Sequence, residues 1–441
     1  RQIMRLNGHN ETAFILCEED VPAFSRLSDY VWLEPFLLSR KIREKIDGPV
    51  LPLLVEWEKR GVWVAGDYFP VFDAADASDV IGKIRQDGFS PFVYLSGMLY
   101  TFDNDKGNKP IPGSERYADL FALDKDGKPA VDILAGYRHS YCFCPALQGT
   151  RAFFRSVIDQ LHALGIDVIQ MDQATSGAGR ACYSAAHGHP PGPGPYQAQA
   201  FRELLADMRS HGRSLSKDFM QMNEELHEEL IPYVDGFHTR EYKEYWWYRD
   251  APGARGIPLF TYLYHEYAIA YGGDSAGLGK YKNTNYVREH AVNLVSGKTP
   301  GAAVWSYQQA AAEAHPDQIH MLRNHSHLLK TEARRFLMLG RMLYPMEFDV
   351  PSTTFQIGVE KDKKWHLVPF VERAVLTSSW QSPEGLVGHC LVNVTDAKQP
   401  VRLPLDTRNA PGWSKADVDL YRADKPELCE HVLQGVALPH E

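Results

Sequence analysis

Short apolar runs alternate with amphipathic segments along most of this chain, and this alternation strongly constrains its fold. The runs are rich in β-branched residues, which is typical of strands buried on both faces of a parallel sheet. The segments between them, such as 150–165 and 196–212, place apolar residues on one helical face. The repetition predicts an α/β protein with a (β/α)8 TIM-like barrel. The expected strands are 49–57, 90–97, 167–172, 217–224, 234–240, 258–266 and 301–307.

The remaining barrel strand has two candidate positions. It lies either in residues 12–19 or within residues 334–345, and the second segment fits a helix equally well. An open, doubly wound sheet is the alternative architecture. No glycine-rich phosphate loop follows an early strand, so the usual purpose of that fold is missing.

The pattern changes near residue 346, which suggests a domain boundary. Beyond it the apolar runs are short, β-branched and separated by turn residues, as in an antiparallel β-sandwich. We therefore expect a catalytic barrel at 49–345 and a β-sandwich at 346–441. Residues 1–48 are expected to be an N-terminal segment, the tail of a further domain.

Charge and hydropathy exclude several kinds of partner. The formal net charge of −9, with scattered acidic residues, argues against nucleic acid and against an anionic membrane surface. No stretch reaches the roughly 18 to 20 apolar residues of a membrane span. The first residue is Arg rather than Met, so we expect a secreted or periplasmic protein if a targeting segment has been removed. The oligomeric state stays open.

The residues that end the expected strands are rich in acids and aromatics. Because the carboxyl ends of barrel strands converge on one face, they are expected to line a common mouth. Carboxylates and flat apolar side chains are what cleavage of a glycosidic bond requires, so we expect a carbohydrate substrate. Asp172 and Glu224 end consecutive strands and are the expected catalytic pair. The expected substrate-binding residues are Trp57, His189, Arg240, His265, Glu266 and Trp305.

A loop rich in glycine and proline follows Asp172. Such a loop forms no regular element, so we expect it to cross the barrel mouth, where His189 reaches a sugar hydroxyl. Cys182, His187 and His189 also permit a zinc site together with Asp172 or His265, but their spacing matches no compact zinc motif. We therefore expect no metal and no cofactor, because two carboxylates suffice for the chemistry.

Several segments carry a family resemblance: "QMDQ" followed by "HGHPPGPGPY", "NEELHEELIPYVDGF" and "PLFTYLYHEYAIAYGG". Through them, residues 49–345 resemble an uncharacterised bacterial family of glycoside-hydrolase-like (β/α)8-barrel proteins. An Asp on one strand and a Glu on the next is also similar to retaining α-glycosidases of the α-amylase and endo-α-N-acetylgalactosaminidase type. This likeness implies that Asp172 is the nucleophile and Glu224 the acid/base. The chain departs from the amylase pattern at Gln170, where that pattern has an Arg.

Three other hypotheses stay open at this point. In a β-acting retaining glycosidase, Glu224 is the acid/base and Glu266 the nucleophile. A metal-dependent, amidohydrolase-like barrel would use His187, His189, His265 and a carboxylate. A carbohydrate-binding protein without turnover is the third. The two carboxylates of the expected pair also have purely structural explanations, as a helix cap and as a first-turn glutamate.

Overall fold

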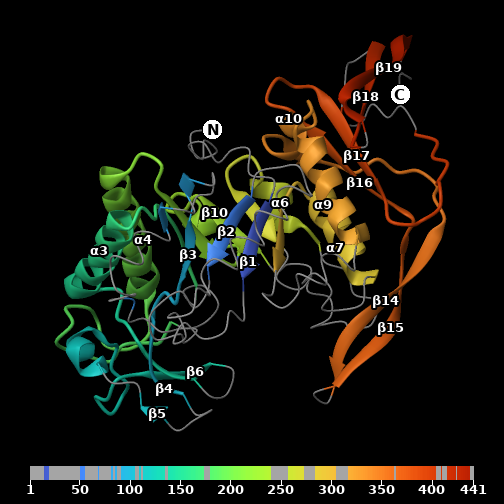
Figure 1. Cartoon of the computed structure of the whole chain (residues 1–441). Coiled ribbons are helices and arrows are strands. Elements are labelled where there is room, and N and C mark those ends of the chain that lie inside the picture. The colour runs from blue at the N-terminus through green and yellow to red at the C-terminus, as the bar shows by residue number, and fades with distance from the viewer. Residues whose placement is uncertain are drawn as a thin grey trace.

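The structure is a computed structural model (Figure 1). It describes residues 14–18, 50–54, 68, 81–82, 85–86, 91–104, 109–110, 113–134, 138–172, 179–239, 257–272, 284–303, 316–361, 364–403, 409, 415–423 and 425–437. In these ranges, no helix is both long enough and apolar enough to span a membrane.

Eight parallel strands form a closed barrel at the centre of the molecule (Figure 1). They are hydrogen-bonded in the order β1-β12-β11-β10-β9-β8-β3-β2, and β2 pairs with β1 to complete the circle. The strands are β1 (Phe14–Glu18), β2 (Val50–Leu54), β3 (Phe92–Leu95), β8 (Val168–Met171), β9 (Met220–Glu224), β10 (Gly236–Thr239), β11 (Ile269–Gly272) and β12 (Thr299–Ala303). Residues 12–19 thus contain the remaining strand, and the barrel begins before residue 49.

Strand alternation divides the apolar side chains between two cores. Phe92, Val168, Met222 and Tyr271 belong to a cluster inside the barrel. Their neighbours along the strands, such as Ile169, belong to a larger cluster that also includes helix residues. Both faces of β3 are buried and it is an apolar run without polar alternation, as the sequence predicts, whereas the equally buried β9 also carries Gln221 and Asn223.

Helices α3 (Gln148–Ala163) and α4 (Pro195–Leu215) cover one side of the barrel and pack against each other (Figure 1). They confirm the two helices expected at 150–165 and 196–212. Pro195 occupies the first turn of α4, where its missing N–H costs nothing. Further α-helices in the described residues are α6 (Leu259–Tyr264), α7 (Thr284–Val295), α9 (Pro316–Leu329) and α10 (Arg334–Leu337).

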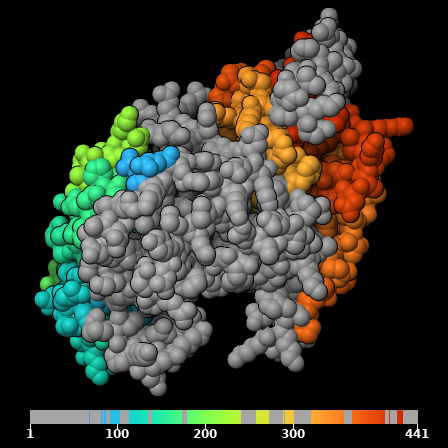
Figure 2. Space-filling model, in the orientation of Figure 1, coloured from blue at the N-terminus to red at the C-terminus, as the bar shows by residue number. Residues whose placement is uncertain are grey.

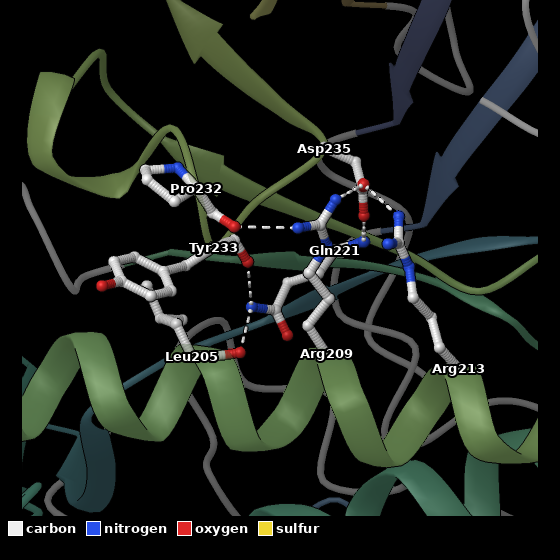
Figure 3. Close-up of polar contacts among 7 residues, drawn as sticks. All are labelled: Leu205, Arg209, Arg213, Gln221, Pro232, Tyr233 and Asp235. Atoms are coloured by element: carbon white, nitrogen blue, oxygen red, sulfur yellow. Dashed lines mark hydrogen bonds and ion pairs between the residues drawn. The ribbon is translucent and has the colours of Figure 1, made fainter. Parts of the chain in front are cut away.

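An ion-pair network around the buried carboxylate of Asp235 fixes α4 against β9 and the start of β10 (Figure 3). The carboxylate of Asp235, only 1% exposed, accepts hydrogen bonds from Arg209 at 2.5 Å and Arg213 at 2.7 Å, and from the Gln221 backbone N–H at 2.9 Å. The Gln221 side-chain amide in turn donates to the carbonyls of Leu205 and Tyr233. These contacts lie before the carboxyl ends of β9 and β10, so they hold the strands that carry the mouth residues.

A small antiparallel sheet is inserted between β3 and β8 (Figure 1). Its order is β5-β4-β7-β6, and chain connectivity places it beyond the carboxyl end of β3. The strands are β4 (Leu99–Asn104), β5 (Lys109–Pro110), β6 (Val131–Leu134) and β7 (Arg138–Cys142). This insertion therefore stands at the same end of the barrel as Asp172.

The C-terminal part consists of antiparallel sheets, which lie across the molecule from α3 and α4 (Figures 1 and 2). One sheet contains β13 (Arg341–Leu343), β16 (Val375–Gln381) and β17 (Val387–Asn393). Two hairpins pair β14 (Ser352–Lys361) with β15 (Lys364–Arg373), and β18 (Lys415–Arg422) with β19 (Lys425–Ala437). The expected antiparallel β structure is present, while the packing of these sheets as a sandwich stays a prediction.

Two sequence expectations about elements need correction. Residues 258–266 were expected to be a strand, but Leu259–Tyr264 form α6, and the barrel strand is β11 at Ile269–Gly272. Residues 334–345 hold α10 and β13 rather than a barrel strand. Periodicity over such short apolar runs does not separate a strand from one or two helical turns, and barrel closure decided between them.

Candidate active site

Asp172 and Glu224 stand side by side at the carboxyl ends of β8 and β9. The register pairs Met171 with Asn223, so the next residue on each strand is one of the two carboxylates. Because side chains alternate along a strand, both point to the same face as Met222, the interior of the barrel. Both are buried, at 2% and 6% exposure. The expectation that two consecutive strands present these carboxylates together at one end of the barrel therefore agrees with the strand register.

Tyr94 orients the carboxylate of Asp172. It lies on β3, the neighbour of β8, and its hydroxyl donates a hydrogen bond to Oδ2 of Asp172. The Asp172 backbone N–H is held by the Leu95 carbonyl at 2.9 Å, so both the main chain and the side chain of Asp172 are tied to β3. A phenol donor next to a buried carboxylate stabilises its ionised form, the form that a nucleophile needs.

The backbone around Glu224 has an unusual conformation. Glu225 has φ of 60°, in the left-handed region that residues other than glycine rarely occupy. Its N–H donates to the His238 carbonyl at 2.8 Å, and the Asn223 side chain donates to the Glu224 carbonyl at 2.7 Å. These bonds hold the chain where it leaves β9 and thereby fix the position of Glu224.

Polar and aromatic groups fill the neighbouring barrel positions. His238 pairs in register with Glu224 on one side and with Tyr271 on the other. The rings of His238 and Tyr271 are stacked, with centroids 5.3 Å apart and planes at 15°. The Tyr271 hydroxyl donates to Oε1 of Gln170, which lies on β8 two residues before Asp172. At the position of the amylase-type Arg, this chain thus has an amide that accepts from a phenol.

His265 and Glu266 do not end a barrel strand. They follow α6 and precede β11, so they lie toward the opposite end of the strands from Asp172 and Glu224. Both ring nitrogens of His265 contact backbone carbonyls, Nδ1 with Gly340 at 2.7 Å and Nε2 with Gly297 at 2.9 Å. Burial lowers the pKa of His265, and hydrogen bonds to those carbonyls oppose the shift.

The positions of His265 and Glu266 therefore do not support the substrate-binding roles expected of them. His265 packs at 4.6 Å, centroid to centroid, against Trp380 of the C-terminal sheet, which is a structural contact. With Glu266 outside the mouth, the alternative in which it acts as nucleophile loses its basis as well. Of the other expected substrate-binding residues, Trp57, Arg240 and Trp305 lie outside the described residues.

The loop between β8 and α4 brings its cysteine and histidines together with Cys144, which was not among the expected zinc ligands. The group consists of Cys144, Cys182, His187 and His189, and their ligand atoms all lie within 4.8 Å of one another. Asp172 and His265 are described but are not part of it, so the amidohydrolase-like arrangement with those residues is not formed. In the sequence, Cys142 and Cys144 flank a single residue, but nothing in that spacing indicates which of them joins the histidines.

Burial shifts the pKa of two members of this group. It raises the pKa of the Cys144 thiol to about 12 and lowers the pKa of His187, with a further lowering from His189. Both shifts favour the neutral forms of Cys144 and His187. His189, expected to reach a sugar hydroxyl, instead has its Nε2 3.4 Å from Sγ of Cys144.

Comparison with known proteins identifies a family match over more than half of the chain. Residues 34–275 match the model of a family described as "Domain of unknown function (DUF6259)". A relative from Bacteroides thetaiotaomicron, named "Putative glycoside hydrolase", is 23% identical over 362 residues, which is 77% of this chain and 46% of the relative. The chain thus spans about half the length of the curated relative that it matches.

Solved structures with a similar fold include two glycosidases. Ligand-free α-N-acetylgalactosaminidase NagBb from Bifidobacterium bifidum aligns with a TM-score of 0.53 at 14% identity, covering 88% of this chain and 58% of that chain. A variant of the GH36 α-galactosidase AgaA from Geobacillus stearothermophilus aligns with a TM-score of 0.55 at 12% identity, covering 99% of this chain and 54% of that chain. At these identities the likeness concerns the fold.

Proposed function

The chain belongs to the DUF6259 family, and we propose that it is a glycoside hydrolase that cleaves O-glycosidic bonds with retention of configuration. One observation carries the proposal: two buried carboxylates, Asp172 and Glu224, are adjacent in register at the carboxyl ends of neighbouring strands. The name of the Bacteroides relative and the glycosidase fold support the same class of reaction.

The strand geometry favours retention over inversion. Neighbouring strands lie roughly 4.7–4.9 Å apart, so two side chains that point inward from adjacent register positions begin at about that separation. Retaining enzymes hold their carboxyl groups roughly 5–5.5 Å apart, whereas inverting enzymes need about 6.5–9.5 Å to admit a water molecule. The register of Asp172 and Glu224 is therefore compatible with direct attack by one carboxylate.

In the proposed reaction, Asp172 is the nucleophile. Its carboxylate attacks the anomeric carbon while Glu224, as an acid, protonates the departing glycosidic oxygen. The resulting glycosyl ester on Asp172 is then attacked by water, from which Glu224, now a carboxylate, removes the proton. This step releases the sugar and restores both groups. Tyr94 supports the first step because its hydrogen bond orients the attacking carboxylate.

The first experiment identifies a substrate and the stereochemistry. A panel of p-nitrophenyl α- and β-glycosides is incubated with the protein, and release of nitrophenol is followed. The panel begins with α-D-galactoside and α-N-acetylgalactosaminide, the sugars in the names of the two structural neighbours. Proton NMR of the first product shows its anomer. A product of inverted configuration would contradict the retaining mechanism, and binding without turnover across the panel would favour a carbohydrate-binding protein.

The second experiment separates the two roles. Asp172→Ala is expected to abolish turnover of every substrate, because no other group forms the covalent intermediate. Glu224→Ala is expected to keep the first step for substrates with good leaving groups, and added azide restores turnover as a glycosyl azide of unchanged configuration. Glu266→Ala is the matched control and keeps normal activity. Loss of activity in Glu266→Ala together with normal activity in Asp172→Ala would overturn the assignment.

A further inference from the structure

The group formed by Cys144, Cys182, His187 and His189 is a second cluster of chemically competent residues, distinct from the two carboxylates. We propose that it binds one Zn²⁺ ion in a closed, structural site, independently of the proposed hydrolase activity. Cys144 follows β7, and the other three come from the loop that connects β8 to α4. The proposal departs from the sequence expectation that the chain holds no metal.

The distances match those of a tetrahedral zinc site. Sγ of Cys144 lies 3.4 Å from Nε2 of His189, and Sγ of Cys182 lies 3.3 Å from Nδ1 of His187. With Zn–S bonds of about 2.3 Å and Zn–N bonds of about 2.0–2.1 Å, tetrahedral angles place sulfur and nitrogen roughly 3.5 Å apart. All four ligand atoms lie within 4.8 Å of one another, so a small inward movement completes the tetrahedron.

The hydrogen bond made by Nδ1 of His189 leaves Nε2 facing the cluster. Nδ1 of His189 is 2.9 Å from the Pro190 carbonyl, and because a carbonyl only accepts, Nδ1 carries the proton. Nε2 therefore presents a lone pair toward Cys144. A second nitrogen bonded to a carbonyl is the usual way in which a protein fixes the tautomer of a metal-binding histidine. The ring is also stacked on Tyr196, 4.2 Å between centroids at 12°.

The backbone of the loop is shaped to carry these ligands. Cys182 forms an isolated bridge with Gly192, whose N–H donates to the Cys182 carbonyl at 2.7 Å, and this bridge closes the segment that contains both histidines. Gly188, between the histidines, has φ of 74°, which reverses the chain locally. The Leu123 N–H lies 3.4 Å from Sγ of Cys182, a donor that stabilises a thiolate.

The ligand set favours zinc and a structural role. Two thiolates and two imidazoles in a tetrahedron are typical of Zn²⁺, and four protein ligands leave no open position for a substrate or a reacting water. Cys144 and Cys182 are completely buried beside Ala122 and Ala130, which keeps the sulfur atoms away from solvent oxidants.

The proposed ion links two segments on the active-site side of the barrel. Cys144 leads from the inserted sheet into α3, whereas Cys182 and the histidines follow Asp172 along the chain. A metal cross-link between them closes a loop that contains α3 and β8, and it lowers the entropy of the unfolded chain. Zinc would thereby hold the loop whose first residue after β8 is the proposed nucleophile.

Metal content tests the proposal directly. The full chain is purified without chelators, dialysed against Zn²⁺ and then against metal-free buffer, and its zinc is measured by mass spectrometry of the ions. We expect one zinc per chain in the wild type and in the control Cys142→Ala, another buried cysteine two residues from Cys144. Cys144→Ala and Cys182→Ala are expected to lose the bound zinc. Zinc retained in both variants, or absent from the wild type, would overturn the proposal.

Two further measurements do not depend on whether the cysteine variants fold. His187→Ala and His189→Ala remove half-buried rings, and each is expected to lower zinc affinity by at least about 10-fold. Co²⁺ bound to the wild type should give the intense visible bands of a tetrahedral ion with thiolate charge transfer. An octahedral Co²⁺ spectrum, or a disulfide between Cys144 and Cys182 in protein kept free of oxidants, contradicts the site.

Discussion

The hydroxyl of Tyr94 donates a hydrogen bond to Oδ2 of Asp172 from the neighbouring barrel strand. The two residues are 78 positions apart in the sequence, and both are almost completely buried. A hydrogen bond to a charged group typically contributes more free energy than one between neutral groups. Removing this contact should therefore slow the proposed reaction measurably.

Tyr94→Phe should therefore lower kcat/KM by about 10- to 100-fold, the equivalent of roughly 1.5–3 kcal/mol for a hydrogen bond to a carboxylate. The measurement is steady-state turnover of the best aryl glycoside. Tyr271→Phe is a matched control, because its hydroxyl donates to the neutral amide of Gln170 and not to Asp172. Equal losses in both variants would mean that the Tyr94 contact has no special role.

Removing the carboxylate of Asp235 should destabilise the fold. Asp235→Ala leaves Arg209 and Arg213 without their common partner next to β9. Breaking a fully buried pair costs about 3–5 kcal/mol, and because the Arg213 side chain is 45% exposed we expect a loss at or below the lower end of that range. Urea unfolding measures the loss. Glu229→Ala is the control, since its ion pair with Arg202 is exposed to solvent and contributes little. A similar midpoint for both variants would show that the network in Figure 3 is not important for stability.

Two buried histidines should make stability fall in acid. Burial lowers the pKa of His290 and of His325 to about 3, and for His290 the neighbouring His325 adds to the shift. The folded protein keeps both rings neutral, whereas the unfolded chain protonates them near pH 6.5. Stability is therefore complete above pH 6.5 and is lost as the pH falls toward 3, by up to about 1.4 kcal/mol per pH unit for each ring.

The check is the urea midpoint measured between pH 7 and pH 4. His325→Asn should flatten its pH dependence, because one of the two rings no longer takes up a proton on unfolding. His320→Asn, an exposed position on the same helix α9, should leave the slope unchanged. An unchanged slope in His325→Asn would contradict the assignment of the acid sensitivity to this ring.

Gly297→Ala should loosen the contact between the barrel and the C-terminal sheets. A Cβ at this position would lie 2.5 Å from Nε2 of His265 and 2.6 Å from Trp380, and its φ of 64° is unfavourable for other residues. Overpacking and backbone strain together should cost about 2–5 kcal/mol in thermal or urea unfolding. Gly385→Ala isolates the strain, because φ there is 93° but nothing lies within 4 Å of the added Cβ.

Local sequence pattern was enough to predict the strands that lead to Asp172 and Glu224. β8 is a short, mostly apolar run followed directly by Asp172, and β9 is a short methionine-containing run that ends in Glu224. These features are local, so pattern and spacing suffice to predict them. The same holds for α3 and α4, whose apolar residues recur with helical spacing. The expected antiparallel structure after residue 346 likewise follows from the change to short β-branched runs.

The way in which distant segments meet could not be predicted from local pattern. Barrel closure chose β1 over residues 334–345 and made β11, not the apolar run of α6, the seventh strand, so His265 and Glu266 moved away from the mouth. The contact of Tyr94 with Asp172 and that of Cys144 with His189 join residues far apart in sequence. Such contacts depend on strand register and on where loops return, and these are set by packing of the whole barrel, which no local pattern encodes.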